Sequence, residues 1–476
     1  MTAPPRAARR GRQRSRGVVL ALLAAALGVL GVVSASTSPS APAAPRPSAM
    51  AVGVGTESSA SYCGGLEHQP GVVSSTVAIA DLAGVARTLE VTTSNERGRA
   101  SRRLLAVRPG DVLHLDPSQL LEGRVEAMTI VADGGGVAAT ESVTGAGGTA
   151  VAPCLTQAGP SWTLTGGSTQ VGHSLTVSVL NPYATSAQVT VSFLTPGGFV
   201  EPSAYKGLDL GPHQLAVLDV KDVAPKQSSI TTDVVTTSGN VVAFAVGRST
   251  SGVGSVSLLP GAPATALAAT FALTPNFSGA TSRLVLANLA TTSVAATVRT
   301  TWSPGCGAHC AAPDTISVLA GGTLTLQVAP SSRAPIDVVA ATQLVATAPG
   351  LVVVQDVATP TSDGQSAALD DPSLQGATRL VLVDPTPSRF ERVSMANTGD
   401  AAVSVTLEAV GPHGLRIGRT VSVAPHGVTI VNGRRLGRLT GGVLLLAATG
   451  PIYATGEVRD ALLGSDLLAA VPVSYP

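Results

Sequence analysis

The chain of 476 residues has little charge, few aromatic side chains and almost no lysine. Charged residues make up 12% of it, about half the share in an average soluble protein. Aromatic residues make up 3%, and lysine occurs only as Lys206, Lys221 and Lys226. A nucleic-acid-binding protein normally carries a basic face with interleaved aromatic residues. The composition and the net charge of +1 therefore argue against nucleic-acid binding.

Sequence signatures of catalysis are missing too. The chain has no Gly-x-Ser-x-Gly elbow, no His-Glu-x-x-His pair, no phosphate-binding loop and no EF-hand loop. The acids Glu90, Glu126 and Glu141 are scattered without a pattern that indicates a catalytic pair. His213 and His426 fall in equivalent turns of a repeat, which favours a structural role. We therefore predict a protein that is not an enzyme, with no catalytic residue, no cofactor and no metal site.

The N-terminus has the layout of an export signal. Residues 1–16 hold six arginines and no acid, and an apolar run that ends in small residues follows over 17–35. We predict that 17–35 is either a cleaved signal peptide or a retained transmembrane anchor, with 1–16 on the cytoplasmic side. Residues 36–59 are rich in Ser, Ala and Pro, which is typical of an extended linker. These segments predict an extracytoplasmic protein, secreted or membrane-anchored.

The rest of the chain repeats one β-rich unit about four times. The stretch that closes each unit recurs at 132–141, 236–245, 346–355 and 448–457. A second stretch alternates apolar and Thr/Ser residues, which indicates a half-buried antiparallel strand, as at 187–192 and 402–407. We place four β-modules at residues 60–158, 159–265, 266–372 and 373–476.

The fold class predicted from this pattern is all-β. Each module has about six or seven short strands at hairpin spacing, which favours an immunoglobulin-like β-sandwich. A β-propeller built from the same strands is the alternative. Asn181, Asn288 and Asn397 follow equivalent strands, and Asp81 takes this place in the first module. Asn or Asp suits a turn there because its side chain can bond the nearby backbone.

Four cysteines in a chain with an export signal favour disulfides. Cys63 and Cys154 lie at the two ends of the first module, so a bond between them would close a long loop and stabilise by roughly 4 kcal/mol. Cys306 and Cys310 would close a small loop. With His309 they could instead bind a metal, but structural zinc normally needs four ligands and no second pair is present. Disulfides are therefore the preferred interpretation.

The run Leu180-Asn181-Pro182 followed by Val189-Thr190-Val191 resembles a family of actinobacterial secreted or membrane-anchored proteins of unknown function. Its members also show one N-terminal hydrophobic segment and tandem β-modules. The resemblance implies a role in the cell envelope and supplies no catalytic residues.

The preferred hypothesis is a non-enzymatic, exported cell-envelope protein whose β-modules form a scaffold for protein or envelope interactions. Its expected partners are the membrane, through the N-terminal segment, and an unknown envelope protein or polysaccharide, but not nucleic acid. One alternative is a cell-wall carbohydrate-binding protein, with Trp302 beside the Cys306 loop as a possible binding surface. A divergent hydrolase is the other.

Overall fold

A computed structural model gives the fold of the part of the chain that carries the repeats. By its internal contacts the chain divides into residues 1–52 and 53–476, and the ranges below belong to the second unit. The predicted basic segment, hydrophobic segment and nearly all of the linker lie outside them. None of the described helices has the length and hydrophobicity that crossing a bilayer requires. The structure describes residues 59–68, 74–82, 85–145, 148–250, 255–262, 267–276, 281–302, 313–328, 338–358, 365–366, 368–369, 377–383, 389–410, 416–432, 443–460, 464–469 and 471–472.

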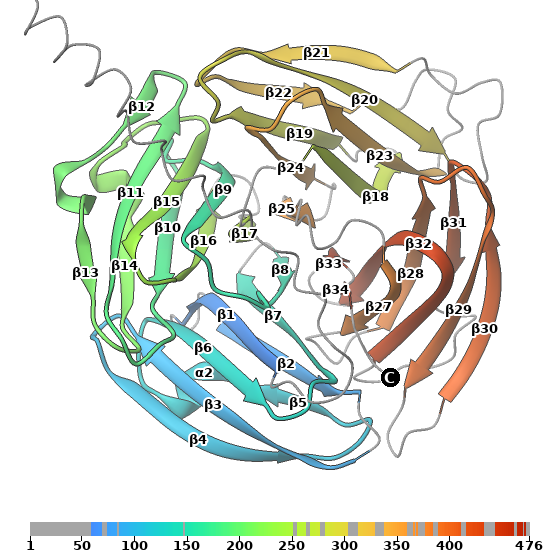
Figure 1. Cartoon of the computed structure of the whole chain (residues 1–476), viewed down its shortest axis with the longest axis horizontal. Coiled ribbons are helices and arrows are strands. Elements are labelled where there is room, and N and C mark those ends of the chain that lie inside the picture. The colour runs from blue at the N-terminus through green and yellow to red at the C-terminus, as the bar shows by residue number, and fades with distance from the viewer. Residues whose placement is uncertain are drawn as a thin grey trace, which may run out of the picture. The chain divides into compact units, whose positions relative to one another are not determined.

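Module 1 consists of two four-stranded sheets (Figure 1). One has the order β1-β6-β3-β4 and the other the order β5-β2-β7-β8. A short helix α2 (Pro117–Leu120) lies between β5 and β6, and the Asp116 side chain caps it. The strands are β1 (Ser59–Glu67), β2 (Ser74–Asp81), β3 (Arg87–Asn95), β4 (Ala100–Val107), β5 (Val112–Leu115), β6 (Val125–Ala132), β7 (Val137–Gly145) and β8 (Gly148–Pro153).

Modules 2 and 3 repeat this strand order. The sheets of module 2 run β9-β15-β11-β12, with β13 also on β11, and β14-β10-β16-β17; those of module 3 run β18-β23-β20-β21 and β22-β19-β24-β26. Module 2 also has two short 3-10 helices, η1 (Ser203–Tyr205) and η2 (Val220–Asp222). The strands are β9 (Ser161–Gly167), β10 (His173–Leu180), β11 (Ala187–Thr195), β12 (Gly198–Val200), β13 (Leu208–Leu210), β14 (Leu215–Asp219), β15 (Ile230–Ser238), β16 (Val242–Ser249), β17 (Ser255–Pro260), β18 (Ala268–Asn276), β19 (Thr281–Asn288), β20 (Val294–Trp302), β21 (Asp314–Val318), β22 (Thr323–Gln327), β23 (Val338–Ala346), β24 (Leu351–Ala358), β25 (Gln365–Ser366) and β26 (Ala368–Leu369).

Module 4 has the same order with one difference. Its strand β32 is 18 residues long and belongs to both sheets: its first part pairs with β27 and β29, and its second part with β28 and β33. Its two parts therefore occupy the positions of β6 and β7 of module 1. The strands are β27 (Ala377–Val383), β28 (Arg389–Asn397), β29 (Val403–Val410), β30 (Arg416–Val423), β31 (Gly427–Asn432), β32 (Val443–Asp460), β33 (Gly464–Ala469) and β34 (Val471–Pro472).

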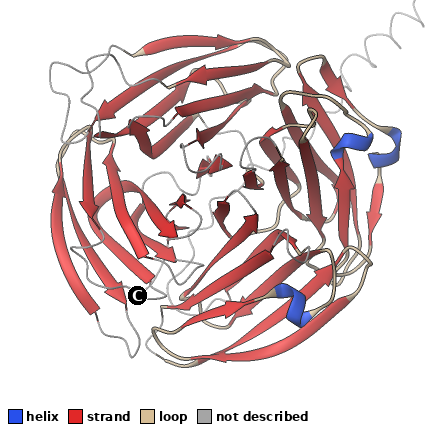
Figure 2. Cartoon of the chain, turned by 180° about the vertical axis from the view of Figure 1, so that it is seen from behind, coloured by secondary structure: helices blue, strands red, loops and turns tan. Residues whose placement is uncertain are grey.

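Each module buries its core between its two sheets. In module 1, Leu89 of β3 and Ile130 of β6 share one buried cluster with Val77 and Ile79 of β2 in the opposite sheet. Strands account for most of the described chain (Figure 2). The all-β sandwich prediction is therefore confirmed, whereas a propeller blade would be a single sheet.

Module 1 has eight strands, not the six or seven that the sequence pattern predicts. The additional strand is the last one. In module 1 it is β8, whose residues are almost all buried. A strand covered on both faces shows no alternation of apolar and polar residues, so the period-2 test does not detect it.

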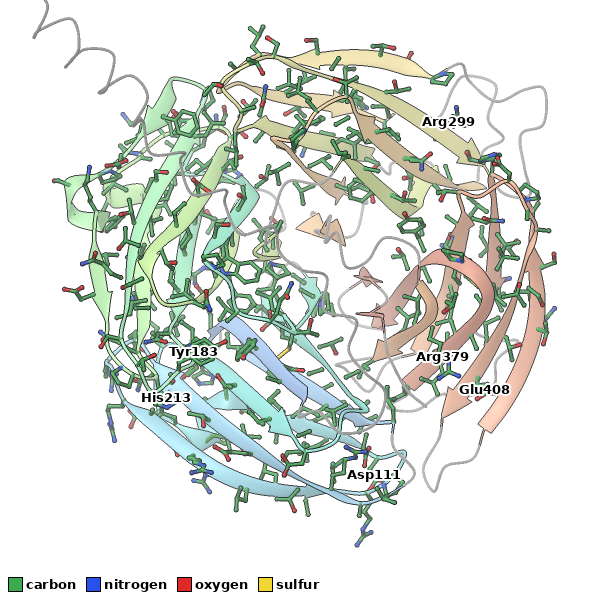
Figure 3. The ribbon with its side chains drawn as sticks, in the orientation of Figure 1. Asp111, Tyr183, His213, Arg299, Arg379 and Glu408 are labelled. Atoms are coloured by element: carbon green, nitrogen blue, oxygen red, sulfur yellow. A yellow bond between two sulfur atoms is a disulfide. The ribbon has the colours of Figure 1, made fainter. Side chains whose placement is uncertain are left out.

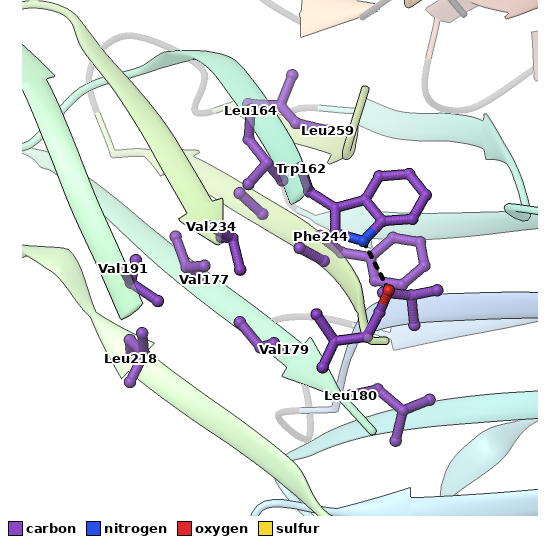
Figure 4. Close-up of a cluster of buried hydrophobic side chains, with 14 of the residues drawn as sticks. Trp162, Leu164, Val177, Val179, Leu180, Val191, Leu218, Val234, Phe244 and Leu259 are labelled. Atoms are coloured by element: carbon purple, nitrogen blue, oxygen red, sulfur yellow. Dashed lines mark hydrogen bonds between the residues drawn. The ribbon is translucent and has the colours of Figure 1, made fainter. Parts of the chain in front are cut away.

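The core of module 2 is centred on Trp162, whose side chain is 1% exposed. Its indole Nε1 donates a hydrogen bond of 2.6 Å to the carbonyl of Val241, so its one polar atom is satisfied (Figure 4). Leu164, Val234 and Phe244 belong to the same cluster. This tryptophan is therefore part of the core and is not available to a ligand.

Contacts between the modules of this unit link each module to the next and module 4 back to module 1. Val143 of module 1 packs with Val246 of module 2, and β25, near the end of module 3, pairs in parallel with β17 of module 2. Ser394 Oγ of module 4 donates to the Ala272 carbonyl of module 3 at 2.5 Å. Thr140 Oγ1 of module 1 donates to the Val383 carbonyl of module 4 at 3.0 Å. The last strands also meet, since β8 contacts both β17 and β33.

One buried asparagine joins distant strands in the same way in three modules. Asn181 is 1% exposed, and its Nδ2 donates to the carbonyls of Thr185, Leu210 and Gly211 at 2.7 to 3.2 Å. Its Oδ1 accepts from the Tyr183 N–H at 3.1 Å. The amide thereby closes its own turn and ties it to a second turn 30 residues later. Asn288 and Asn397 repeat the pattern.

The second turn, which the asparagine bonds in modules 2 to 4, has the same form in all four modules. The N–H of its fourth residue bonds the carbonyl of its first, as Gln214 does with Gly211 at 3.2 Å. Its third residue has a positive φ, as a type II turn requires: 74° at Gly110, 53° at His213, 59° at Gly321 and 47° at His426. The two histidines therefore occupy a position that glycine fills elsewhere, and the His213 N–H bonds the Tyr183 carbonyl at 3.1 Å (Figure 3).

Module 1 has a charged residue, Asp81, at the position of the buried asparagine. Asp81 is 1% exposed, and its side chain has no N–H to donate. Its Oδ1 lies 3.7 Å from Nε of Arg87, whose Nη1 in turn bonds the carbonyl of Asp133. An ion pair with Arg87 thus takes the place of the asparagine amide, and the arginine bonds the turn between β6 and β7 instead of the second turn.

We predict that Asn181→Asp lowers the free energy of unfolding by about 3 kcal/mol or more. The carboxylate keeps the acceptor but loses both N–H donors and faces three carbonyls. Urea denaturation followed by tryptophan fluorescence measures the loss, because Trp162 reports on module 2. Asn240→Asp, at an exposed position, is the control. Equal shifts of the two midpoints would contradict the assigned role of Asn181.

Candidate functional site at the junction of modules 1 and 2

A disulfide between Cys63 and Cys154 joins the two ends of module 1. Both cysteines are buried, with Cys63 in β1 and Cys154 just after β8. Next to it, Tyr62 and Leu155 exchange two backbone hydrogen bonds of 2.7 and 2.8 Å. The bond spans 91 residues of sequence, so it removes much conformational freedom from the unfolded chain.

A buried carboxyl group lies beside the disulfide. One oxygen of Glu141 in β7 and the two Sγ atoms lie within 4.8 Å of one another. Among the described residues, neither Glu141 oxygen accepts a hydrogen bond of normal geometry. Burial raises the pKa of Glu141 well above its ordinary value, and the Gly64 N–H opposes this effect without offsetting it. Burial therefore favours the protonated, uncharged form of Glu141.

Module 2 packs directly against the glycines that follow Cys63. A Cβ atom on Gly64 would lie 2.2 Å from Cδ2 of Phe244, and one on Gly65 would lie 2.9 Å from Cγ2 of Val246. Phe244 and Val246 belong to β16 and are fully buried. The absence of side chains at Gly64 and Gly65 lets the two modules approach this closely.

An ion pair crosses the same junction. Oε2 of Glu67, at the end of β1, lies 3.3 Å from Nε of Arg248 in β16. The Glu67 side chain is 5% exposed and that of Arg248 is 31% exposed. Burial raises the pKa of Glu67, and Arg248 acts against this shift. The side chain of Thr176 in module 2 also hydrogen-bonds Glu67, so Glu67 makes polar contacts with module 2 through two residues.

Another buried acid of module 1, Glu126, has several carboxylate groups near it. Glu126 of β6 is completely buried. Its oxygens accept no hydrogen bond of normal geometry from the described residues, although the Gly123 N–H acts to lower its pKa. Burial and the nearby carboxylates of Glu96, Asp116 and Glu67 raise the pKa of Glu126 to about 7. Burial acts in the same direction on Glu96, but the N–H groups of Val125 and Arg124 lower its pKa overall.

The disulfide limits the metal binding that this site could perform. In the disulfide form Cys63 and Cys154 have no thiolate to offer a metal, and Glu141 alone is a poor ligand set. Within the described ranges, no other group of three metal-ligating side chains comes together. The junction is therefore best described as a structural joint with the buried acids Glu67, Glu126 and Glu141 in module 1.

The structure places the residues proposed from sequence as follows. Cys306, Cys310 and His309 lie outside the described residues. Trp302 ends β20, where its backbone pairs with Ala340, but its side chain is not among those described. Glu90 is near the protein surface and bonds Arg102 across β3 and β4. Glu126 and Glu141, in contrast, are buried acids of module 1.

Sequence reasoning missed two features of module 1. The role of Arg248 could not be found, because nothing in sequence relates it to Glu67 in another module. The other feature was visible: residues 97–108 hold five arginines and no acid. They lie on the hairpin of β3 and β4, and all five are exposed.

We predict that Gly64→Ala destabilises the junction by about 1 to 3 kcal/mol, because the new methyl group overlaps the Phe244 ring. The thermal unfolding midpoint of the variant measures this. Gly418→Ala is the matched control, since its Cβ would meet Glu408 Cγ at an ordinary 3.8 Å. If the two variants lose the same stability, the assigned close packing at Gly64 is wrong.

We predict that removing the disulfide in the Cys63→Ala/Cys154→Ala double variant lowers the free energy of unfolding by roughly 4 kcal/mol. Denaturant titrations of wild type and double variant, each with and without a reducing agent, measure it. Reductant should bring the wild type close to the double variant. An unchanged midpoint in the double variant would show that the bond contributes no stability.

The Glu126 carboxyl makes stability depend on pH. Its folded-state pKa of about 7 lies above the ordinary 4.5, so the folded state holds the proton more tightly than the unfolded state. The resulting stabilisation is complete below pH 4.5 and is lost as pH rises through about 7. We predict that Glu126→Gln removes this part of the pH dependence between pH 5 and 8, as measured by urea midpoints. Glu90→Gln should leave the slope unchanged, and equal slopes in wild type and Glu126→Gln would refute the assignment.

One family model matches part of the chain. A model of the Family of unknown function (DUF5719) matches residues 123–262. That range runs from the end of module 1 through module 2 and includes Glu126, Glu141, Cys154 and Arg248. No curated protein matches the chain.

Two solved structures show only a distant likeness. One is described as the crystal structure of a tetra-tandem repeat in the extending region of a large adhesion protein. It is 15% identical, covers 85% of this chain and 96% of its own, and has a TM-score of 0.14. The other is a Streptomyces avermitilis alpha-L-rhamnosidase complexed with L-rhamnose. It is 12% identical, covers 77% of this chain and 53% of its own, and has a TM-score of 0.12.

Proposed function

We propose that the chain is a non-enzymatic, exported protein of the cell envelope, and that its four β-modules form a scaffold for interactions. The observation that supports this most is the repeated use of buried polar residues as structural joints. Asn181, Asn288 and Asn397 make equivalent bonds in modules 2, 3 and 4, and Thr140 and Ser394 bond neighbouring modules. Such joints give a rigid platform that presents its outer faces.

Two features support an extracytoplasmic location. The buried Cys63–Cys154 disulfide belongs to an oxidising compartment. Residues 1–35 have the basic and then apolar pattern of an export signal. In this proposal the segment 17–35 is either cleaved or retained as the membrane anchor, and the modules act outside the membrane.

A cell-wall carbohydrate-binding protein is the second candidate. Sugar rings stack on exposed aromatic faces, and module 2 exposes two aromatic side chains: Tyr183 is 40% exposed and Phe199 is 56% exposed. Trp302 of module 3 adds a third aromatic residue to this candidate. The scaffold proposal is preferred because it uses the whole repeat.

Location is tested on intact cells that produce the full chain with a C-terminal tag. If the protein is exported, protease added outside the cells removes the tag without lysis. A variant that lacks residues 1–35 should keep its tag until lysis. Protection of the tag in the full chain would overturn the proposed location.

The scaffold role is tested by in-cell cross-linking together with sedimentation on purified, protein-free cell wall. A scaffold for proteins gives discrete cross-linked partners that depend on the modules. Sedimentation that soluble sugar abolishes, and that Trp302→Ala or Phe199→Ala weakens more than tenfold, would instead support the carbohydrate-binding candidate.

A further inference from the structure

The β3–β4 hairpin of module 1 carries the densest positive charge of any described segment. Arg97 and Arg99 are at its tip, and Arg102, Arg103 and Arg108 follow along β4 and just beyond it. Glu96 pairs with Arg97 at 3.4 Å, and Glu90 pairs with Arg102. For Arg99, Arg103 and Arg108 no acidic partner is found among the described residues. The hairpin thus keeps a net positive charge in a chain with little charge elsewhere.

The tip of the hairpin is held in a fixed conformation. Asn95 is completely buried, and its Oδ1 accepts from the N–H groups of Arg97 and Arg99 at 3.1 and 3.0 Å. Its Nδ2 donates to the Glu122 carbonyl at 2.8 Å. The backbone that carries the first two arginines is therefore anchored to the core, which lowers the entropy cost of binding through them.

The arginines line an open sheet edge. The strand β4 ends the order β1-β6-β3-β4 and pairs only with β3 among the described strands. Val107 is buried and Leu105 packs on the core, so Arg103 shares their side of the strand, while Arg102 and the 67% exposed Leu104 take the other. Residues 99–108 span about 30 Å at ~3.3 Å per residue. The edge is therefore a linear cationic track with charge on both sides.

The other modules show that the fold does not need this charge. Charged residues on an edge strand commonly prevent edge-to-edge aggregation. The equivalent strand of module 3, β21, has no basic residue, and β12 and β13 of module 2 have none within their bounds. The strand β30 of module 4 has Arg416 and Arg419 only. Edge protection therefore does not explain five arginines in module 1.

We propose that this hairpin binds a linear polyanion of the cell envelope, namely a phosphodiester-linked wall polymer, along the edge of β4. The planar guanidinium group matches phosphate oxygens in pairs, and a repeating anion along a chain matches arginines spread over a straight strand. The inference deepens the proposed function and depends on it only for exposure to the envelope.

Binding is tested with the full chain, purified in a non-ionic detergent, and a fluorescently labelled poly(glycerol phosphate) chain. Anisotropy should show binding that weakens steadily with added salt, since arginines displace counterions from the polymer. The Arg99→Gln/Arg103→Gln/Arg108→Gln variant should bind about tenfold or more weakly and with a shallower salt dependence. The matched Arg99→Lys/Arg103→Lys/Arg108→Lys variant keeps the charge but loses the planar guanidinium, so it should bind more tightly than the Gln variant and more weakly than the wild type. Arg419→Gln, on the equivalent strand of module 4, should bind like the wild type.

Three outcomes would overturn the proposal. The first is equal polymer binding by the triple Gln variant and the wild type, with circular dichroism showing that both are folded. The second is arginine-dependent binding to anionic lipid vesicles but not to the polymer, which would make the track a membrane contact. The third is equally strong binding to an uncharged wall polysaccharide. The assay uses purified protein, so its failure is separate from a failure of the proposed location.

Discussion

The fold depends on how a sandwich satisfies buried backbone groups where its chain changes sheets. A turn buried at the end of a strand leaves carbonyls that water cannot reach, and each unsatisfied group costs about 1 to 3 kcal/mol. An asparagine side chain both donates and accepts, so Asn181 bonds its own turn and the turn 30 residues later. This single residue type holds two loops of a module together, and it recurs at Asn288 and Asn397.

Module 1 departs from this solution, and the departure changes its electrostatics. Asp81 stands in place of asparagine and forms an ion pair with Arg87. The same module contains the buried acids Glu126 and Glu141 and the cross-module pair of Glu67 with Arg248. Buried charge is tolerated only when it is paired or neutralised by a proton. The raised pKa of Glu126 therefore links the stability of module 1 to pH.

Much of the fold was predictable from sequence because alternation of apolar and polar residues reports directly on half-buried strands. The stretch 187–192 alternates and forms β11 as expected. The strand β8 was missed because neighbours cover it on both faces, which removes the pattern. Contacts between modules were beyond reach: nothing in the sequence places Phe244 against Gly64, since that contact depends on how whole sandwiches pack. The candidate site was the least predictable part. The pairing of Cys63 followed from its position in the module, but nothing in the sequence places Glu141 beside the disulfide.

Equivalent positions of the four modules can be compared within one chain. This comparison separates residues that the fold requires from residues that serve a function. A residue that recurs at equivalent positions, such as Asn288, serves what all modules share, which is the sandwich itself. A feature confined to one module cannot be required by the common fold. The arginines of the β3–β4 hairpin are such a feature, because β21 forms the same edge with no basic residue. By this reasoning the search for a partner belongs on the outer edge of module 1, and the buried polar residues of modules 2 to 4 belong to the framework.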